Sequence, residues 1–525
     1  MPNVSLEDRV PQILANLPTR ISDVARRWSQ ASPQNLALVE SSGAWTFGQL
    51  QTAVDETQSW LVSLGVRPGD RVLIVCENCR ALVAILLAVA SLDALPVLVN
   101  AKLSAREVDE IREHCGARRA FYTADLSHQA REHANRHGAA MDEIANLGLI
   151  GIGSLNHDAG SEPLDANEAE RVAALIYTSG TTGLPKGVML TNKNLLYMAA
   201  MSTEVRNITP ADRMYGVLPM SHAVGLSVVL LGALYSGATL YIAPRFDPAG
   251  AFRSLEQDKL TIVLGVPAFF ALLVDYAKMK GIASLDLPAL RIISSSGAPL
   301  HPHLKSEVEN LFHRVLHNGY GVTECSPTIA QTRPDTPRKD RSIGRVFPGV
   351  EVKLAGLTAE QIANGEVGEL CVRGPNIMKG YYRDAEATAA AIDADGWFNT
   401  RDLARFEGDH LFIVGRTKDL IVRFGFNVYP AEVEGVLNAH PQVVRSAVVG
   451  RTVSSECGEE IIAFVQPQPN SPVTTDEISE HAAQYLSPYK RPTAIIFAND
   501  LPVSPTGKVL KEELAKQFSS NPSER

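Results

Sequence analysis

Apolar runs alternate with helical stretches along the N-terminal part of the chain. Residues 71–78 are mostly apolar and predict a buried strand, residues 79–94 predict a buried helix, and residues 95–100 predict a second strand. Together they make a βαβ unit with two parallel strands. Further strands or strand–helix pairs are predicted over 171–178, 213–220, 239–244, 261–277 and 290–297. The pattern predicts an α/β fold with parallel-type sheets covered by helices.

The pattern changes near residue 344. Segments 344–356, 366–375 and 409–416 are short apolar runs divided by Gly, Pro and Asp, which predicts a small β-rich subdomain. A small α+β unit follows Gly415. Its predicted elements are helices over 430–440 and 474–486 and strands over 444–451, 459–467 and 493–500. We therefore expect an N-terminal domain over 1–414, β-rich from about 344 to 414, and a C-terminal domain over 415–525.

The composition excludes several classes of protein. The 525 residues include 49 Lys and Arg against 58 Asp and Glu, a net charge of −9, so we expect no nucleic-acid partner and no polybasic membrane anchor. The longest apolar run, Ala81 to Leu92, is too short to cross a bilayer, so no integral membrane segment is predicted. The first residues lack a signal-peptide pattern, and we expect a cytoplasmic protein.

The six cysteines are scattered, and Cys76 and Cys79 form the only CxxC pair. A zinc site would need a second pair of ligands, and a redox pair would need a thioredoxin-like context. Neither follows in the sequence. We therefore predict that both thiols are packed at a strand-to-helix turn.

A loop rich in glycine and hydroxyl residues, YTSGTTGLPKGV, runs from Tyr177 to Val188 directly after an apolar strand. Its backbone donors could wrap phosphate oxygens, with Lys186 adding a positive charge. It is not a Walker A loop, because Gly180 and Gly183 are too close together and Lys186 is followed by Gly187. From its composition alone, a phosphate-binding loop and a plain polar turn are equally supported.

Further motifs follow in order along the chain: LPMSHAVGL (218–226), SSSGAPL (294–300), NGYGVTECSP (318–327), GELCVRGPNIMKGYY (368–382), DGWFNTRDLARF (395–406), GRTKDLIVRFGFNVYPAEVE (415–434) and LPVSPTGKVLKEEL (501–514). With the glycine-rich loop, this set resembles the adenylate-forming superfamily of acyl-CoA synthetases, luciferases and peptide-synthetase adenylation domains. The resemblance extends from Thr46 to Leu514 and is strongest to bacterial fatty-acid or aryl-acid CoA ligases.

The resemblance implies a site for ATP, Mg²⁺ and an acid, with coenzyme A as co-substrate. It assigns the Mg²⁺ ligand to Glu324, the ribose hydroxyls to Asp402 and Arg416, the adenine face to Tyr320, and the charge on the α-phosphate to Lys508, with Lys186 beside it. The full set of residues implied to bind ATP or AMP is Thr178, Ser179, Gly180, Thr181, Thr182, Gly183, Lys186, Gly297, Ala298, Asn318, Gly319, Tyr320, Gly321, Thr323, Asp402, Arg416 and Lys508.

The same resemblance implies two successive half-reactions. The acid attacks the α-phosphate of ATP to give an acyl-adenylate and pyrophosphate, and a thiol then displaces AMP. The C-terminal domain would rotate between the steps about Lys418, withdrawing Lys508 and bringing Gly425 to the thiol tunnel. Two positions depart from the family pattern: Arg401 stands where Gly is common before the ribose carboxylate, and bulky Phe424 precedes Gly425.

The acyl pocket implied by the resemblance is neutral, and His222 would separate the acid from the thiol. Its predicted lining is His222, Ala223, Val224, Gly225, Gly297, Gly321, Val322 and Pro327. Because these segments offer no cation beyond His222, we expect an apolar monocarboxylic acid, either a medium-to-long fatty acid or an aryl acid.

Three alternatives to a coenzyme A ligase remain at this point. The acceptor could be a separate acyl-carrier protein, the chain could be a luciferase-like oxygenase, or it could be a nucleotide-binding protein without catalysis.

Overall fold

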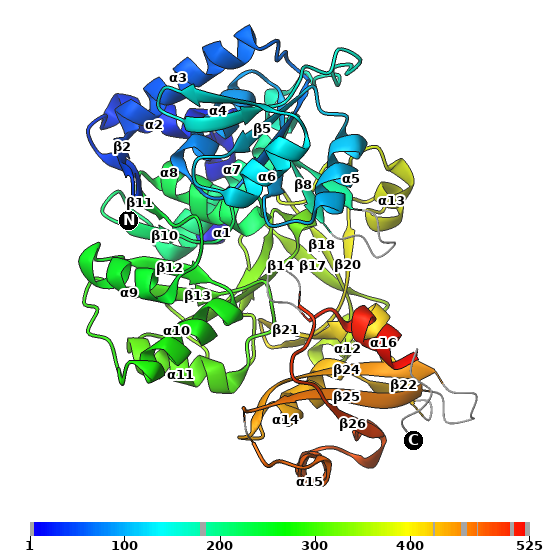
Figure 1. Ribbon diagram of the computed structural model, residues 1–525. Helices are drawn as coiled ribbons and strands as arrows, with labels where there is room; N and C mark the ends of the chain where they lie inside the picture. The colour runs from blue at the N-terminus through cyan, green and yellow to red at the C-terminus, as the bar shows by residue number, and fades with distance from the viewer. Residues whose placement is uncertain are drawn as a thin grey trace.

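The computed structural model describes residues 5–178, 185–423, 426–452, 459–469, 471–503 and 509–519. Two large mixed sheets dominate the N-terminal part (Figure 1). The eight-stranded sheet has the order β19 (Gly380–Tyr381), β9 (Lys186–Thr191), β8 (Val172–Thr178), β4 (Leu95–Asn100), β3 (Arg71–Cys76), β5 (Arg119–Thr123), β7 (Gly148–Ile152) and β6 (Ala140–Ile144). Its central strands β8, β4, β3 and β5 are parallel, as predicted, and its edges are antiparallel.

The second sheet has nine strands and again a parallel centre, from β14 to β1, with antiparallel edges. Its order is β16 (Arg345–Val346), β15 (Thr328–Gln331), β14 (Leu316–Gly321), β13 (Ile292–Ser295), β12 (Ile262–Gly265), β10 (Arg213–Gly216), β11 (Thr239–Ile242), β1 (Leu36–Glu40) and β2 (Gly43–Thr46). The predicted α/β fold class is therefore confirmed, with antiparallel edge strands added.

Helices form a layer between the two sheets and cover their outer faces. The inner layer contains α3 (Phe47–Ser63), α4 (Arg80–Ser91), α7 (Asn192–Arg206), a π-helix (Val224–Leu231) and α8 (Gly232–Ser236). The outer helices are α5 (Ala105–Cys115) and α6 (His128–Arg136) on one sheet, and α9 (Pro248–Gln257), α10 (Pro267–Met279) and α11 (Pro302–Phe312) on the other. The remaining N-terminal helices are α1 (Leu6–Ala15) and α2 (Asp23–Ala31).

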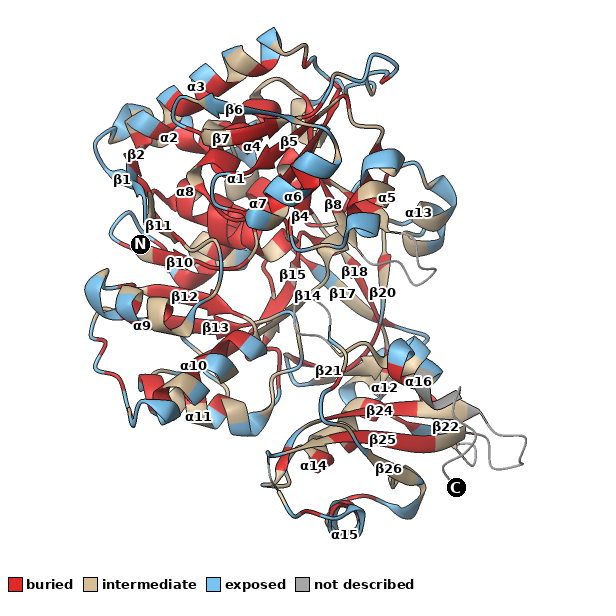
Figure 2. Ribbon diagram, in the orientation of Figure 1, coloured by how far each residue is buried: buried red, intermediate tan, exposed pale blue. Residues whose placement is uncertain are grey.

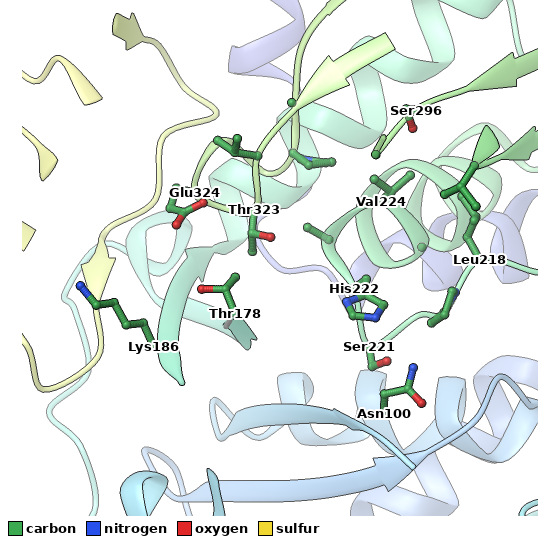
Figure 3. Close-up of a pocket in the computed structure, with 18 of the residues that line it drawn as sticks. Asn100, Thr178, Lys186, Leu218, Ser221, His222, Val224, Ser296, Thr323 and Glu324 are labelled. Atoms are coloured by element: carbon green, nitrogen blue, oxygen red, sulfur yellow. The ribbon is translucent and has the colours of Figure 1, made fainter. Parts of the chain in front are cut away.

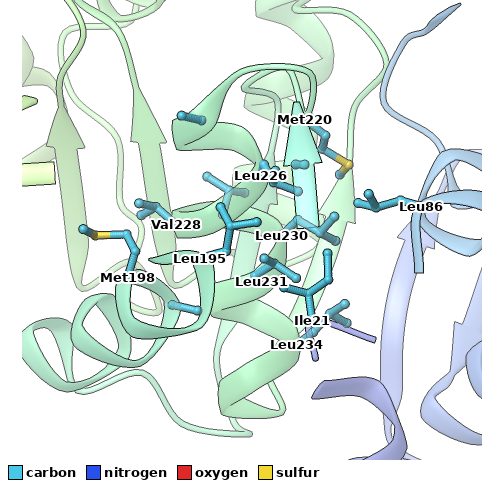
Figure 4. Close-up of a cluster of buried hydrophobic side chains, with 14 of the residues drawn as sticks. Ile21, Leu86, Leu195, Met198, Met220, Leu226, Val228, Leu230, Leu231 and Leu234 are labelled. Atoms are coloured by element: carbon cyan, nitrogen blue, oxygen red, sulfur yellow. The ribbon is translucent and has the colours of Figure 1, made fainter. Parts of the chain in front are cut away.

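Both faces of each parallel centre are buried, which explains why these strands are continuous apolar runs rather than alternating ones. Along β3, Ile74 belongs to the core between the sheets, while Leu73 and Val75 belong to the outer core. Figure 4 shows the inner core, where Leu226, Leu230 and other residues of the π-helix meet side chains of α7. Figure 2 shows exposed residues on outer helix faces, on loops and on edge strands such as β6.

The CxxC cysteines lie at the turn between β3 and α4, as predicted. Cys79 is the N-cap of α4, and its Sγ accepts a hydrogen bond from the Leu82 amide at 3.4 Å. Burial raises the pKa of Cys79 to about 12. Five cysteines within the described ranges are free and buried. Cys79 thus serves packing and helix capping.

The β-rich region forms an antiparallel sheet of β17 (Glu351–Ala355), β18 (Gly368–Arg373), β20 (Phe398–Glu407) and β21 (His410–Arg416), with α12 (Ala359–Ala363) and α13 (Ala385–Ala391) beside it. The prediction differs from this structure in one detail, because residues 345–346 pair with β15 and so belong to the nine-stranded sheet. β21 ends at Arg416, as expected for the segment 409–416.

The C-terminal elements surround hydrophobic clusters of their own, apart from the N-terminal cores. They are β22 (Ile421–Arg423), β23 (Phe426–Val428), α14 (Pro430–Leu437), β24 (Val443–Thr452), β25 (Glu459–Pro467), α15 (Thr475–Tyr485), β26 (Ala494–Phe497) and α16 (Lys511–Ser519). In Figure 1 they form the orange and red lobe below the larger one. In the part of the chain that the structure covers, no helix has the length and apolarity needed to cross a membrane.

Candidate functional site

A cavity of about 1160 Å³ lies where the carboxyl ends of strands from both large sheets meet. Asn100 ends β4, Thr178 ends β8, Ser296 follows β13 and Gly321 ends β14, and all four line the cavity. The carboxyl edge of parallel strands is the usual ligand site in open α/β sheets, because the strand order leaves a crevice there. The fold therefore places this cavity where small-molecule chemistry is expected.

Asn78, two residues after the end of β3, joins the two sheets at this edge. Its Nδ2 donates to the carbonyls of Gly216 at 3.1 Å and Leu218 at 2.9 Å, and its Oδ1 accepts from the Met220 amide at 2.8 Å. The strand predicted over 213–220 is present as β10 but ends at Gly216. Beyond Gly216 the backbone of Leu218 and Met220 bonds to the Asn78 side chain instead of to a neighbouring strand. The loop that follows carries His222 into the cavity.

The polar wall of the cavity contains Thr178, Lys186, Thr323 and Glu324 (Figure 3). The Tyr381 hydroxyl donates to Glu324 Oε1 at 2.9 Å, and Lys186 Nζ lies 4.9 Å from the centroid of the Tyr381 ring. Burial, followed by the Glu324 charge, raises the pKa of the Tyr381 phenol, so it remains a hydrogen-bond donor. Tyr381 was not among the predicted site residues, although it is the penultimate residue of the motif GELCVRGPNIMKGYY.

This wall fits a magnesium ion bound together with phosphates. Glu324 offers one carboxylate, and the described residues contain no group of three or more His, Cys, Asp or Glu side chains that could hold a metal alone. Mg²⁺ is usually held by one or two carboxylates plus phosphate oxygens and waters. A lone carboxylate beside Thr323 and Lys186 matches that donor set.

The three residues that the resemblance assigned to the nucleoside lie together: Asp402, Tyr320 and Arg416. Asp402 is 3% exposed. Its Oδ1 lies 2.9 Å from Arg416 Nε, and its Oδ2 accepts from the Tyr320 hydroxyl. Burial and the adjacent Asp402 raise the pKa of Tyr320 well above its ordinary value. Arg416 borders the large cavity. The buried carboxylate is thus held rigidly between a cation and a phenol.

Asn318, Ala298 and Gly319 are not part of the described lining of the large cavity. Asn318 is buried, and its Nδ2 donates to the Ser342 carbonyl at 3.2 Å, which fixes the loop between β15 and β16 to β14. Other predicted positions lie outside the described residues: Ser179, Gly180, Thr181, Thr182, Gly183, Phe424, Gly425 and Lys508.

All eight residues predicted for the acyl pocket line the large cavity. Burial lowers the pKa of His222, so its imidazole is neutral at pH 7. Two of the glycines allow close backbone approaches. A Cβ at Gly225 would lie 2.0 Å from the Pro219 carbonyl oxygen. A Cβ at Gly321 would lie 1.9 Å from the Pro327 carbonyl oxygen. Apolar residues outside the motifs extend the same wall: Phe246, Val266, Phe269 and Leu272.

Cations from outside the segments predicted to line the acyl pocket also border the large cavity. Lys102, Arg245, Arg401 and Lys418 line the same cavity. Arg245 is paired with Glu77 at 2.9 Å, so its charge is largely compensated. These residues come from the loops after β4 and β11 and from the region around β20 and β21. These parts of the chain lie outside the segments predicted to line the acyl pocket.

Lys418, the predicted hinge, directly follows the β-rich sheet. Its Nζ lies 2.7 Å from Glu512 Oε1 on α16, and both side chains are largely exposed. Val503, also from the C-terminal region, borders the large cavity. Residues on both sides of Lys418 therefore contribute to one cavity.

Comparison with known proteins gives the class of protein. Residues 25–382 match the AMP-binding enzyme family, and residues 432–508 match the AMP-binding enzyme C-terminal domain. The chain is 34% identical to a feruloyl-CoA synthase from Amycolatopsis sp over 496 residues, covering 94% of this chain and 98% of the relative. It is 32% identical to 4-coumarate–CoA ligase 3 from Oryza sativa subsp. japonica, covering 92% and 88%.

Solved structures agree. ATP-bound MatB from Rhodopseudomonas palustris superposes with a TM-score of 0.82 at 26% identity, covering 95% of this chain and 99% of that one. The o-succinylbenzoate coenzyme A synthetase MenE from Bacillus subtilis, in complex with ATP and magnesium ion, gives a TM-score of 0.79 at 27% identity, covering 94% and 99%.

The chain belongs to the AMP-binding enzyme family. Within it, the chain is an AMP-forming acid–thiol ligase of the acyl-CoA synthetase kind, which uses ATP and Mg²⁺ with coenzyme A as co-substrate. These assignments confirm the resemblance, the enzyme class and the cofactors expected from the sequence.

Arg401 gives a prediction about stability. It adopts φ +59°, the left-handed region that favours glycine, and its side chain is 63% exposed. Replacing it by glycine should raise the free energy of unfolding by about 0.5–1 kcal/mol, measured by urea denaturation. Arg401→Ala is the control, because it removes the guanidinium but keeps Cβ. Equal effects of the two substitutions would contradict backbone strain as the cause.

His317 on β14 gives a prediction about pH. Burial, followed by the charges of Arg206 and Lys305, lowers its pKa to about 4. A histidine in the unfolded chain has a pKa of ~6.5. Between this pKa and the folded pKa of about 4, the unfolded chain binds a proton that the folded chain does not. The free energy of unfolding therefore falls as the pH drops through this window. Between pH 7 and 5 the wild type should lose about 2 kcal/mol more than His317→Gln, measured by urea denaturation.

The control for His317 is His157→Gln at an exposed position. It should leave the pH dependence as in the wild type. If His317→Gln shows the wild-type pH dependence as well, the proposed unfavourable protonation of His317 is wrong.

Proposed function

We propose that this ligase activates aromatic monocarboxylic acids and transfers the acyl group to coenzyme A. The observation that carries this proposal is a single cavity with a phosphate-type polar wall at one side and a neutral, partly aromatic wall at the other. Phe246 and Phe269 pack with ring centroids 4.6 Å apart in that second wall. Such a surface suits a flat ring.

The sequence left a medium-to-long fatty acid and an aryl acid as the two candidate substrates. The two relatives described above carry the names of aromatic acids, feruloyl and coumarate, which supports the aryl alternative. A medium or long fatty acid remains the second candidate, because the apolar lining also suits an alkyl chain. Coenzyme A is favoured over a carrier protein by the same relatives. The cytoplasmic location stays a prediction.

In the first half-reaction the acid's carboxylate oxygen attacks the α-phosphorus of ATP and the bond to pyrophosphate breaks. Negative charge grows on the transferred phosphate, and Lys186, Thr323 and the Tyr381–Glu324 pair stand along the wall where it develops. Mg²⁺ held at Glu324 would screen the ATP phosphate charges. Lys508, which resembles the family's mobile lysine, would add a cation at the α-phosphate.

In the second half-reaction the coenzyme A thiol attacks the acyl carbon and AMP leaves. We propose that neutral His222 separates the acid from the incoming thiol, since a buried imidazole adds no charge beside an apolar acyl group. Rotation of the C-terminal domain about Lys418 would withdraw Lys508 and bring Gly425 toward the thiol. The Lys418–Glu512 pair is exposed and therefore weak enough to break during such a motion.

An acid panel tests the substrate class. Acid-dependent ATP–pyrophosphate exchange should be fastest with arylpropenoic and benzoic acids, slower with hexanoate to laurate, and poor with succinate and malonate, which leave the apolar wall unfilled. AMP release should rise when coenzyme A is added. Preference for laurate over every aryl acid would overturn the aryl assignment. Light emission with oxygen uptake, or no exchange with any acid, would favour the luciferase-like or the non-catalytic alternative.

A lysine substitution tests the two-step scheme. Lys508→Ala should slow adenylation by two to four powers of ten, as expected for loss of a transition-state charge contact, while preformed acyl-adenylate still reacts with coenzyme A at nearly the wild-type rate. Lys511→Ala is a matched control, because Lys511 pairs with Glu434 at 2.6 Å. It should spare both steps. Equal losses in both steps for Lys508→Ala would rule out the exchange of conformations.

A further inference from the structure

Tyr381 contacts two charged side chains of the polar wall that do not pair with each other. Its hydroxyl donates to Glu324 Oε1 at 2.9 Å, and Lys186 Nζ lies 4.9 Å from the centroid of its ring. Figure 3 shows Lys186 and Glu324 along the same side of the cavity. Within the residues that the structure describes, the Tyr381 hydroxyl is the one hydrogen-bond partner of the Glu324 carboxylate. Most of the carboxylate's acceptor capacity therefore remains for a ligand.

Lys186 is likewise left without an opposite charge. Among the described residues, no carboxylate lies within 4.0 Å of its ammonium nitrogen. Lys353, away from the site, shows the ordinary arrangement: its Nζ is 4.3 Å from the Trp397 ring centroid and also 3.9 Å from Asp393 Oδ2. A direct ion pair between Lys186 and Glu324 would compensate both charges and leave neither for a ligand. With Tyr381 as the contact of each, the anion and the cation stay separate.

The strand that carries Tyr381 is bonded to both segments that carry these charges. β19 pairs with β9, whose first residue is Lys186. Met378, two residues before β19, donates its amide to the Glu324 carbonyl at 2.8 Å. The amide of Tyr381 itself donates to Thr388 Oγ1 on α13 at 2.9 Å. The backbone thus holds the ring and the hydroxyl in place relative to both charged groups.

We propose that Tyr381 is a positioning residue with two separate tasks: its hydroxyl holds the Glu324 carboxylate for a magnesium ion, and its ring holds the Lys186 ammonium for the phosphates of ATP. This inference rests on the proposed function, in which Mg²⁺ is held at Glu324. Hydrogen-bond partners of a metal-ligating carboxylate fix its orientation, and their loss usually lowers metal affinity about ten- to hundredfold. An aromatic face attracts a cation and so restricts where the flexible lysine lies.

Calorimetric titration with α,β-methylene ATP tests the inference, because this analogue binds but cannot be cleaved between its α- and β-phosphates. Each protein is titrated in excess Mg²⁺ and in EDTA. The dissociation constant in EDTA divided by that in Mg²⁺, the metal ratio, measures what the ion adds to binding. No acid or coenzyme A is present, so the readout is independent of turnover.

Two substitutions of Tyr381 separate the hydroxyl from the ring. Tyr381→Phe removes the hydroxyl and keeps the ring, so the metal ratio should fall about tenfold while the affinity in EDTA stays at the wild-type value. Tyr381→Leu removes both parts, so it should lower the metal ratio equally and also weaken binding in EDTA by about two- to fivefold. A general loss of packing would instead weaken binding in both media and leave the ratio unchanged.

Tyr382→Phe is the matched control, because it removes the hydroxyl of the next residue. That hydroxyl donates to Glu162, and Tyr382 is not part of the described lining of the large cavity. Both dissociation constants should equal those of the wild type. An unchanged metal ratio in Tyr381→Phe, or equal affinities of Tyr381→Phe and Tyr381→Leu in EDTA, would overturn the inference.

Glu324→Gln distinguishes failure of the inference from failure of the proposed function. If Mg²⁺ is held at Glu324, this substitution should bring the metal ratio close to one. A wild-type ratio in Glu324→Gln would refute the magnesium site itself and the inference with it. A ratio that is lost in Glu324→Gln but kept in Tyr381→Phe would overturn the inference alone and leave the proposed function standing.

Discussion

The site depends on the Asn78 side-chain amide, which joins the carboxyl ends of two separate sheets. Its bonds to Gly216, Leu218 and Met220 are buried and use both the donor and the acceptor ends of the amide. A buried amide that lost these partners would leave backbone groups unpaired, so the joint is strongly specified. Because β3 belongs to one sheet and β10 to the other, this contact fixes the cavity between them.

From this joint the two ends of the site acquire different chemistry. The end near β8 and β9 carries Lys186 and Glu324, which suits phosphate and magnesium. The end near β12 and β13 is apolar. Under the proposed function, an acid bound between these ends would present its carboxylate to the polar end and its acyl group to the apolar end. The distribution of charge along the cavity would then orient the substrate before any reaction.

Much of the fold could be predicted from the sequence, because strands buried on both faces leave continuous apolar runs. The strands over 95–100 and 459–467 end where predicted, and the buried helix after Cys79 is present. The edge strand β16 was placed in the wrong sheet, since a two-residue pairing depends on tertiary contacts and leaves no periodic signal.

The site was predictable only where residues belong to local motifs. Glu324, His222 and Arg416 lie in such motifs and line the cavity together. Tyr381 was missed although it lies in such a motif, because it meets Glu324 and Lys186 only in the folded chain, where β19 pairs with β9. Arg401 is an intermediate case: its departure from a common glycine was visible in the sequence, and the structure shows the positive φ that explains the glycine preference.

The most direct test of this account is a crystal structure of the enzyme with a non-reactive sulfamoyl analogue of the cinnamoyl adenylate. We expect the sulfamoyl group beside Lys186 and Thr323 and the ring between Val224 and Gly297. An analogue bound with its ring directed toward Arg245 and Lys102 would contradict the account.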